Sequence, residues 1–113
     1  MDDYINTWLF NFKSSIEEIE SYFPNGKVFH FYHEDLKTKR AGERNIEIIG
    51  EAMSRILKQN PEIEISNSRK IVDARNKIIH EYDEISDDVI WGIVMNHLPT
   101  LKIEVENLLP ELD

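Results

Sequence analysis

The spacing of apolar residues is the feature that most constrains the fold of this chain. Within residues 2–23, apolar side chains recur at steps of three and four: Ile5, Trp8, Phe12, Ile16, Ile19 and Phe23. That spacing places them on one stripe of an α-helix, and Pro24 followed by Asn25-Gly26 ends the pattern. No segment alternates apolar and polar residues for long enough to indicate a β-strand. The chain is therefore predicted to be all-α.

The same periodicity predicts the rest of the fold. Further helices are expected over about residues 33–57, 66–82, 86–96 and from 99 onward. Gly42 and Gly50 lie inside the second of these five helices, where a glycine costs about 1 kcal/mol relative to alanine. Close contact with another helix near Gly50 would compensate for that cost. We expect a single domain over residues 1–113, an up-and-down bundle of four to five helices.

Charge is unevenly distributed along the chain. The net charge of −9 argues against a polyanionic partner, because lysine and arginine supply most of the affinity for nucleic acid. Residues 37–77, however, hold ten basic and six acidic residues, whereas the remainder holds three basic and sixteen acidic ones. This segment indicates either a surface that attracts a polyanion or a solvated helix surface, and both interpretations stay open.

Several classes of protein and site are disfavoured. The absence of cysteine excludes disulfides, a thiolate nucleophile and a zinc ribbon. Acidic residues stand at the N-terminus where a secretory signal would carry lysines, and no apolar run approaches the length of a membrane span, so we expect a cytoplasmic protein. His30, His33 and Glu34 could ligate a metal from one helix face, but nearby ligands of this kind are common by chance. We predict neither a metal site nor a cofactor.

The stretch RNKIIHEY, residues 75–82, places polar residues inside an apolar helix. Arg75 shares a stripe with Ile71 and Ile78, while Asn76 and His80 form an i, i+4 pair beside it. A buried arginine is unfavourable without a carboxylate or phosphate, so Arg75 requires a partner from another helix, a cleft or a subunit interface. His80 points about 140° away from Arg75 around an ideal helix. The two would converge more easily across a two-fold axis.

This stretch also carries a resemblance to a known family. Residues 75–82 match the R-x4-H-x-Y motif of the HepT-like toxins, in the HEPN superfamily of small helical ribonucleases. The segment ERNIEIIGEAMSRI, residues 43–56, is similar to the family's second-helix signature. The segment DDVIWGIVMNHLPTLKIEVENLL, residues 87–109, resembles its C-terminal helix pair. The likeness therefore covers most of the chain from about residue 30 onward.

The resemblance implies a dimerising HEPN-like bundle that cleaves RNA without a metal. It suggests an endoribonuclease toxin of a type VII-like HEPN/MNT toxin–antitoxin system, with tRNA a candidate substrate and a composite Arg/His site at the dimer interface. His80 would act as general acid or base, and Arg75 would bind the phosphate as negative charge accumulates. Asn76 would orient the imidazole of His80 or contact the phosphate.

Further residues are assigned candidate roles. The resemblance makes Tyr82 the target of a partner nucleotidyltransferase antitoxin of the MntA type, which attaches AMP and silences the toxin. Glu51, beside Gly50, is a candidate to accept hydrogen bonds from Arg75 or Asn76, although it could equally be a surface glutamate. The basic segment supplies a candidate RNA-facing surface at Lys37, Lys39, Arg40, Arg44 and Lys77.

An alternative function belongs to a different class. The chain could be a non-catalytic helical binding partner, the substrate-binding subunit of a nucleotidyltransferase. Overall acidity favours that alternative. The presence of Arg75, His80 and Tyr82 favours the ribonuclease, because a scaffold has no need of a proton-transfer group near a phosphate-binding one.

Overall fold

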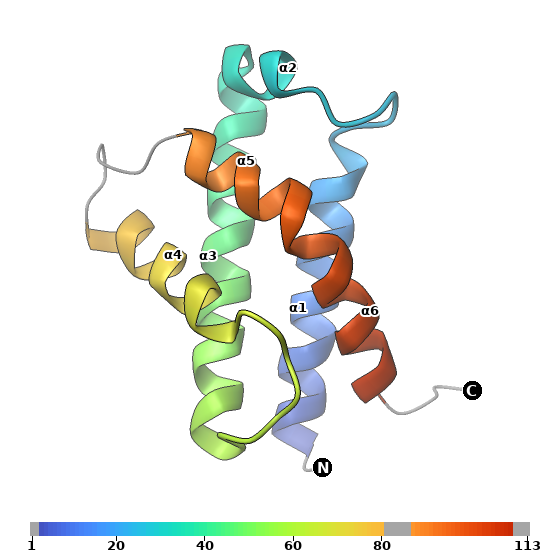
Figure 1. Ribbon diagram of the computed structural model, residues 1–113, viewed down its shortest axis with the longest axis vertical. Helices are drawn as coiled ribbons and strands as arrows, with labels where there is room; N and C mark the ends of the chain where they lie inside the picture. Colours follow the sequence, from blue (N-terminus) through green and yellow to red (C-terminus); the bar gives the residue numbers. More distant parts are fainter. Residues whose placement is uncertain (1–2, 81–86, 110–113) are drawn as a thin grey trace.

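The computed structural model describes residues 3–80 and 87–109, and every regular element in them is a helix (Figure 1). In chain order these are α1 (Asp3–Ser21), α2 (Phe29–Glu34), α3 (Leu36–Gln59), α4 (Ser68–His80), α5 (Asp87–Asn96) and α6 (Leu98–Leu108). The prediction of an all-α chain is confirmed. No helix in the described ranges is long and apolar enough to cross a membrane.

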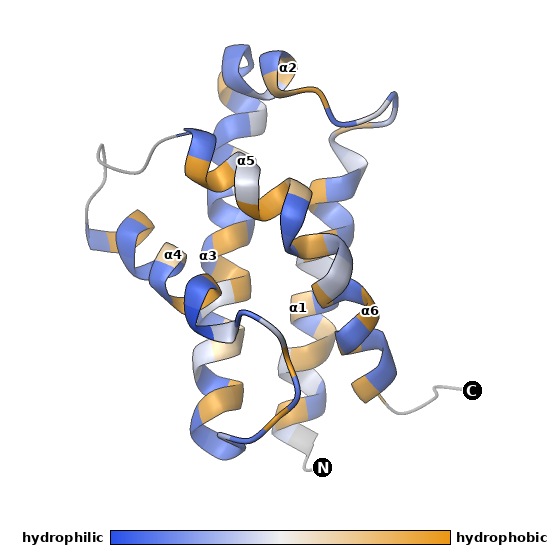
Figure 2. Cartoon of the chain, viewed as in Figure 1, coloured by the Kyte–Doolittle hydropathy of each residue, from blue (hydrophilic) through white to orange (hydrophobic). Residues whose placement is uncertain are grey.

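Helix α3 is the central element, and α1, α2, α4 and α5 all pack against it. Figure 1 shows α1 alongside α3, α4 on the other side, and α5 with α6 crossing in front. Each helix carries both polar and apolar residues along its length, as an amphipathic helix requires (Figure 2). The buried side chains of α3 are Thr38, Asn45, Ile46, Ile49, Ala52, Met53 and Ile56.

The buried stripe of α1 differs by one residue from the predicted one. Its members are Ile5, Leu9, Phe12, Ile16 and Ile19, each less than 5% exposed. Trp8 is only partly buried and lies at the edge of the core, where its ring stacks on that of Tyr4. Leu9 takes the core position because a step of four from Ile5, followed by a step of three to Phe12, keeps the same helical face. The indole of Trp8 is thereby left beside a surface groove.

The predicted single helix over residues 33–57 is two helices. Asp35 has an extended backbone, with φ −99° and ψ 102°, and it separates α2 from α3. Its carboxylate accepts a hydrogen bond of 2.7 Å from the Thr38 hydroxyl. Leu36, an apolar residue in the first turn of α3, is 60% exposed. The prediction of one helix was wrong here because apolar spacing does not reveal the extended backbone at Asp35, and the additional helix brings the total in the described ranges to six.

The contact predicted at Gly50 is present. A Cβ built on this glycine would lie 3.0 Å from the carbonyl oxygen of Ile71 and against the side chain of Arg75. Helix α4 therefore crosses α3 at a point where only a hydrogen atom fits. The missing side chain of Gly50 sets the depth at which Arg75 sits.

Alanine at two helical glycines should have opposite effects. Gly50→Ala should lower the free energy of unfolding by about 1–3 kcal/mol, because the added methyl group forces α3 and α4 apart. Gly92→Ala should raise it by up to about 1 kcal/mol, because a Cβ there meets nothing within 4 Å and the helix gains propensity. Urea unfolding of the two variants measures both effects. Equal effects would contradict the close crossing at Gly50.

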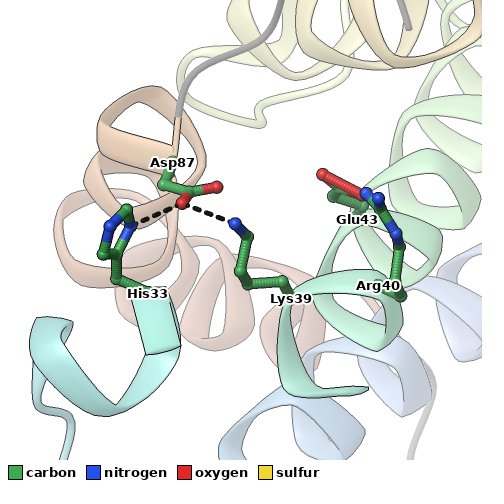
Figure 3. A network of polar contacts seen from close by, with 5 residues as sticks. All are labelled: His33, Lys39, Arg40, Glu43 and Asp87. Carbon is green, nitrogen blue, oxygen red and sulfur yellow. Dashed lines mark hydrogen bonds and ion pairs between the residues drawn. The ribbon is translucent and has the colours of Figure 1, made fainter. Parts of the chain in front are cut away.

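A polar network joins the first turn of α5 to α2 and α3 (Figure 3). The Asp87 carboxylate lies 2.9 Å from the Lys39 Nζ and 2.7 Å from the His33 Nδ1. Burial raises the pKa of Asp87, but the hydrogen bonds from Lys39 and His33 outweigh this effect and leave it below its ordinary value. Beneath the network, burial raises the pKa of Tyr32, whose hydroxyl has no hydrogen-bond partner among the described residues. The three helices are thus joined around one carboxylate.

The lowered pKa of Asp87 predicts a pH-dependent contribution to stability. A carboxylate whose pKa is depressed on folding stabilises the fold above its unfolded pKa, and that contribution is lost as the pH falls through the folded pKa. Wild type should therefore exceed Asp87→Asn in free energy of unfolding above about pH 5, and the gap should narrow below about pH 4. Asp88→Asn, at the exposed neighbouring residue, is the control. A gap of constant size across this range would contradict the assignment.

Candidate active site

Arg75 lies in the wall between α3 and α4, and its side chain is 18% exposed. The guanidinium NH2 is 3.5 Å from a carboxylate oxygen of Glu51. The Nε of Arg75 is buried and donates to no described residue. The carboxylate partner predicted for this arginine is therefore Glu51, but one strong donor of the guanidinium remains unused.

Glu51 contacts two arginines. Its other carboxylate oxygen accepts a hydrogen bond of 3.0 Å from the Nε of Arg55, one turn further along α3. Glu51 is itself 45% exposed, so its ion pair with Arg75 is solvent-screened and contributes little to stability. An anion entering from solvent can replace this carboxylate at modest cost. In this cluster of Glu51, Arg55 and Arg75, the arginines can therefore exchange the carboxylate of Glu51 for an incoming anion.

A cleft of about 480 Å³ opens over this cluster. Its lining includes Lys58 beside Arg55 and Arg75, so three cations face one carboxylate. The Trp8 indole forms another wall, and it also borders a neighbouring groove of about 350 Å³ that extends along α3 toward Arg44 and Ile79. The excess of positive charge suits a phosphate group, which an arginine can bind bidentately.

His80 and Asn76 lie elsewhere on α4. His80 is the last residue of α4 that the structure describes, and both side chains are exposed and form no hydrogen bond or ion pair with any described residue. The structure does not bring either of them to Arg75. On an ideal helix Arg75 and His80 differ by about 140° in direction, so one chain presents the arginine and the imidazole on different sides of α4.

The predicted RNA-facing residues separate into two groups. Lys39, Arg40 and Arg44 form ion pairs with Asp87, Glu43 and Glu47. Lys37 and Lys77 are exposed and pair with no described residue. Sequence reasoning did not single out Arg55, Lys58 or Trp8, although the i, i+4 spacing of Glu51 and Arg55 was a detectable signal.

Two other predictions concern this region. Tyr82 lies outside the described residues. Among the described residues no cluster of three or more His, Cys, Asp or Glu side chains is arranged to hold a metal ion, and His33, one of the three considered as ligands, instead binds Asp87.

Comparison with known proteins identifies the family. The model of the family described as "Ribonuclease HepT-like" matches residues 12–108, which cover all of α2 to α6 and most of α1. The chain belongs to this ribonuclease family. The resemblance to HepT-like proteins of the HEPN superfamily is thus confirmed, and with it the assignment to a class of RNA-cleaving enzymes.

Two relatives match this HepT-like chain over most of both sequences. A protein of Methanocaldococcus jannaschii named "Putative RNase MJ0127" is 26% identical over 96% of this chain and 90% of its own. A Thermococcus cleftensis protein named "Probable ribonuclease HepT" is 34% identical over 89% of this chain and 92% of its own. No solved structure matches the chain.

Proposed function

We propose that this HepT-like protein is a metal-independent endoribonuclease toxin whose active site is completed in a homodimer. The observation that carries the proposal is Arg75, a largely buried arginine with an unpaired Nε that lines a cationic cleft, five residues before an exposed His80 on the same helix. These two groups match the requirements of RNA cleavage, a phosphate binder and a proton-transfer group. Within one chain they do not converge, so a second copy of α4 supplies the missing partner.

The reaction follows from the chemistry of RNA. The 2′-oxygen attacks the adjacent phosphorus, the P–O5′ bond breaks, and the products are a 2′,3′-cyclic phosphate and a 5′-hydroxyl. One imidazole takes the proton of the 2′-hydroxyl, and the leaving 5′-oxygen receives a proton from an imidazolium or from water. Arg75 of one protomer and His80 of the other serve each site, since the guanidinium must contact the phosphoryl oxygens while the imidazole reaches the 2′- or 5′-oxygen. Asn76 orients His80 or contacts the phosphate.

Glu51 is a positioning residue in this scheme. In the free protein it holds the guanidinium of Arg75 in the cleft. When RNA binds, the phosphate replaces the carboxylate as the partner of Arg75, and Arg55 keeps Glu51 neutralised on its other side. Arg75 is therefore ordered before the substrate arrives, which lowers the entropy lost on binding.

Regulation by a partner completes the proposal. An MntA-like nucleotidyltransferase antitoxin would adenylylate Tyr82, two residues after His80, and thereby place an anionic nucleotide beside the site. The attached phosphate would compete with RNA for Arg75. A Tyr82→Phe variant should resist silencing by that partner with ATP, whereas wild type should gain the mass of one or more AMP groups and lose cleavage.

The experiment that tests the activity uses purified protein whose intact mass shows no nucleotide adduct. We expect it to cleave total tRNA in the presence of EDTA and to leave 2′,3′-cyclic phosphate ends. Absence of cleavage from a folded, unadducted dimer on a broad RNA panel would refute the ribonuclease. Stable complex formation with a nucleotidyltransferase would then favour the non-catalytic binding partner, to which the net charge of −9 also points.

A further inference from the structure

A second groove lies between α4 and α5, on the side of α4 away from Arg75. Its volume is about 350 Å³, and Lys70, Asp73 and Lys77 of α4 face Asp88, Val89, Asn96 and His97 across it. This groove shares no lining residue with the cleft that contains Arg75. It is therefore a separate surface that the proposed mechanism does not use.

The two lysines of this groove are available to bind anions. Both are exposed, and neither forms an ion pair with any described residue, including the two carboxylates of the groove, Asp73 and Asp88. Arg40 and Arg44 of α3 differ, because each is paired with a glutamate one turn away. Lys70 and Lys77 are seven residues apart, nearly two full turns, so they stand on one side of α4 about 10 Å apart along its axis.

The floor of the groove is apolar and open. Ala74 and Ile93 are buried beneath it, with 4% and 6% of their surface exposed. Gly92 also lines the groove, and an added Cβ there would meet nothing within 4 Å. An apolar floor with polar groups beside it suits a nucleobase, which needs an apolar surface for its ring face and hydrogen-bonding groups at its edge. Asn96 and Asp73 line the same groove and can supply hydrogen bonds to that edge.

The groove leads toward His80. This residue follows Lys77 by three positions, one turn nearer the C-terminal end of α4. On an ideal helix it points about 60° from Lys77, compared with about 140° from Arg75. An RNA strand with a phosphate in contact with Lys77 would therefore continue toward the imidazole of His80.

We propose that the α4–α5 groove binds one nucleotide of the single-stranded RNA substrate, adjacent to the scissile phosphate. The base lies on the floor over Gly92, and the flanking phosphates contact Lys70 and Lys77. This inference rests on the proposed ribonuclease function for its substrate, but it concerns binding and is measured without cleavage.

The test measures the affinity of the full-length protein for a short single-stranded 2′-O-methyl RNA, which lacks the nucleophilic hydroxyl, over a range of salt concentrations. Lys70→Ala/Lys77→Ala should weaken binding and reduce the slope of log affinity against log salt by about 1.4, or about 0.7 for each lost phosphate contact. Gly92→Leu should cover the floor and weaken binding about tenfold, and it should keep the fold because a Cβ at this position meets nothing within 4 Å. Lys27→Ala, on the connection between α1 and α2, is the matched control and should leave the slope unchanged.

The outcomes separate the groove from the catalytic proposal. If both groove variants keep the wild-type affinity and salt slope, the proposed role of the groove is wrong. It is also wrong if Lys27→Ala loses as much affinity as the groove variants. Cleavage of tRNA by the wild type would still support the ribonuclease in either case. Binding that depends on Lys70, Lys77 and Gly92 without any cleavage would support the groove and count against the ribonuclease. Failure of wild type to bind RNA at any salt concentration would overturn the groove.

Discussion

Replacing His80 with alanine should lower the rate of RNA cleavage by about 10²–10⁴-fold, the usual contribution of a positioned general acid or base. The side chain is exposed at the end of α4 and contacts no described residue, so its removal creates no cavity. Loss of a favourable interaction with the helix dipole should change the free energy of unfolding by no more than about 1 kcal/mol. The measurement is the initial rate on a defined tRNA, together with urea unfolding of both proteins.

His30→Ala is the matched control for this variant. His30 is likewise an exposed histidine near a helix end, in α2, and it lines neither the cleft over Arg75 nor either of the two grooves described above. It should retain the wild-type rate. A His80→Ala protein that is folded, dimeric and as active as the control would remove His80 from the mechanism.

Arg75→Lys should lower cleavage by about 10²–10³-fold, although it preserves the charge. Lysine lacks the planar fork with which arginine binds two phosphoryl oxygens, and its ammonium cannot replace the unused Nε. The loss should appear mainly in kcat, because negative charge on the phosphate increases toward the transition state. Stability should change little, since the lysine stem still packs against Gly50 and its ammonium can still pair with Glu51.

Arg40→Lys provides the comparison. Arg40 is exposed and pairs with Glu43, so exchanging its guanidinium for an ammonium keeps the same charge. No bidentate binding of phosphate is proposed at this site. Its cleavage rate should match that of wild type. If Arg75→Lys raises only KM, or lowers the cleavage rate no more than Arg40→Lys does, the arginine binds RNA as a simple charge and does not stabilise the transition state.

Local rules account for the features that the sequence predicted well. Apolar spacing located both ends of α1 and the start of α4 to within two residues, because burying one face determines where an amphipathic helix forms. The unfavourable glycine at position 50 predicted a helix crossing, and the need of Arg75 for a carboxylate predicted its pairing with Glu51. Both inferences start from an energetic cost that one residue imposes: a glycine inside a helix in one case, and a buried arginine without a partner in the other.

Tertiary placement accounts for what the sequence could not reveal. Lys39, predicted to face RNA, pairs with Asp87, 48 positions away in the sequence, and no local pattern reveals such a contact. The pairs of Arg40 and Arg44 with glutamates at i+3 were visible in the sequence and could have been weighed against that surface. The groove between α4 and α5 was also invisible, because its two walls come from separate segments and its floor depends on the absence of a side chain at Gly92.

The most direct test of the composite site mixes two inactive proteins. In a dimer of Arg75→Ala with His80→Ala, one of the two sites contains both an intact arginine and an intact histidine, contributed by different protomers. After subunit exchange at equal concentrations, about half of the dimers are mixed, so the account predicts recovery of about a quarter of the wild-type rate on tRNA in EDTA. The controls are a mass measurement that verifies subunit exchange and the inactivity of each variant alone. If the mixture also stays inactive under these conditions, Arg75 and His80 do not meet across a dimer interface.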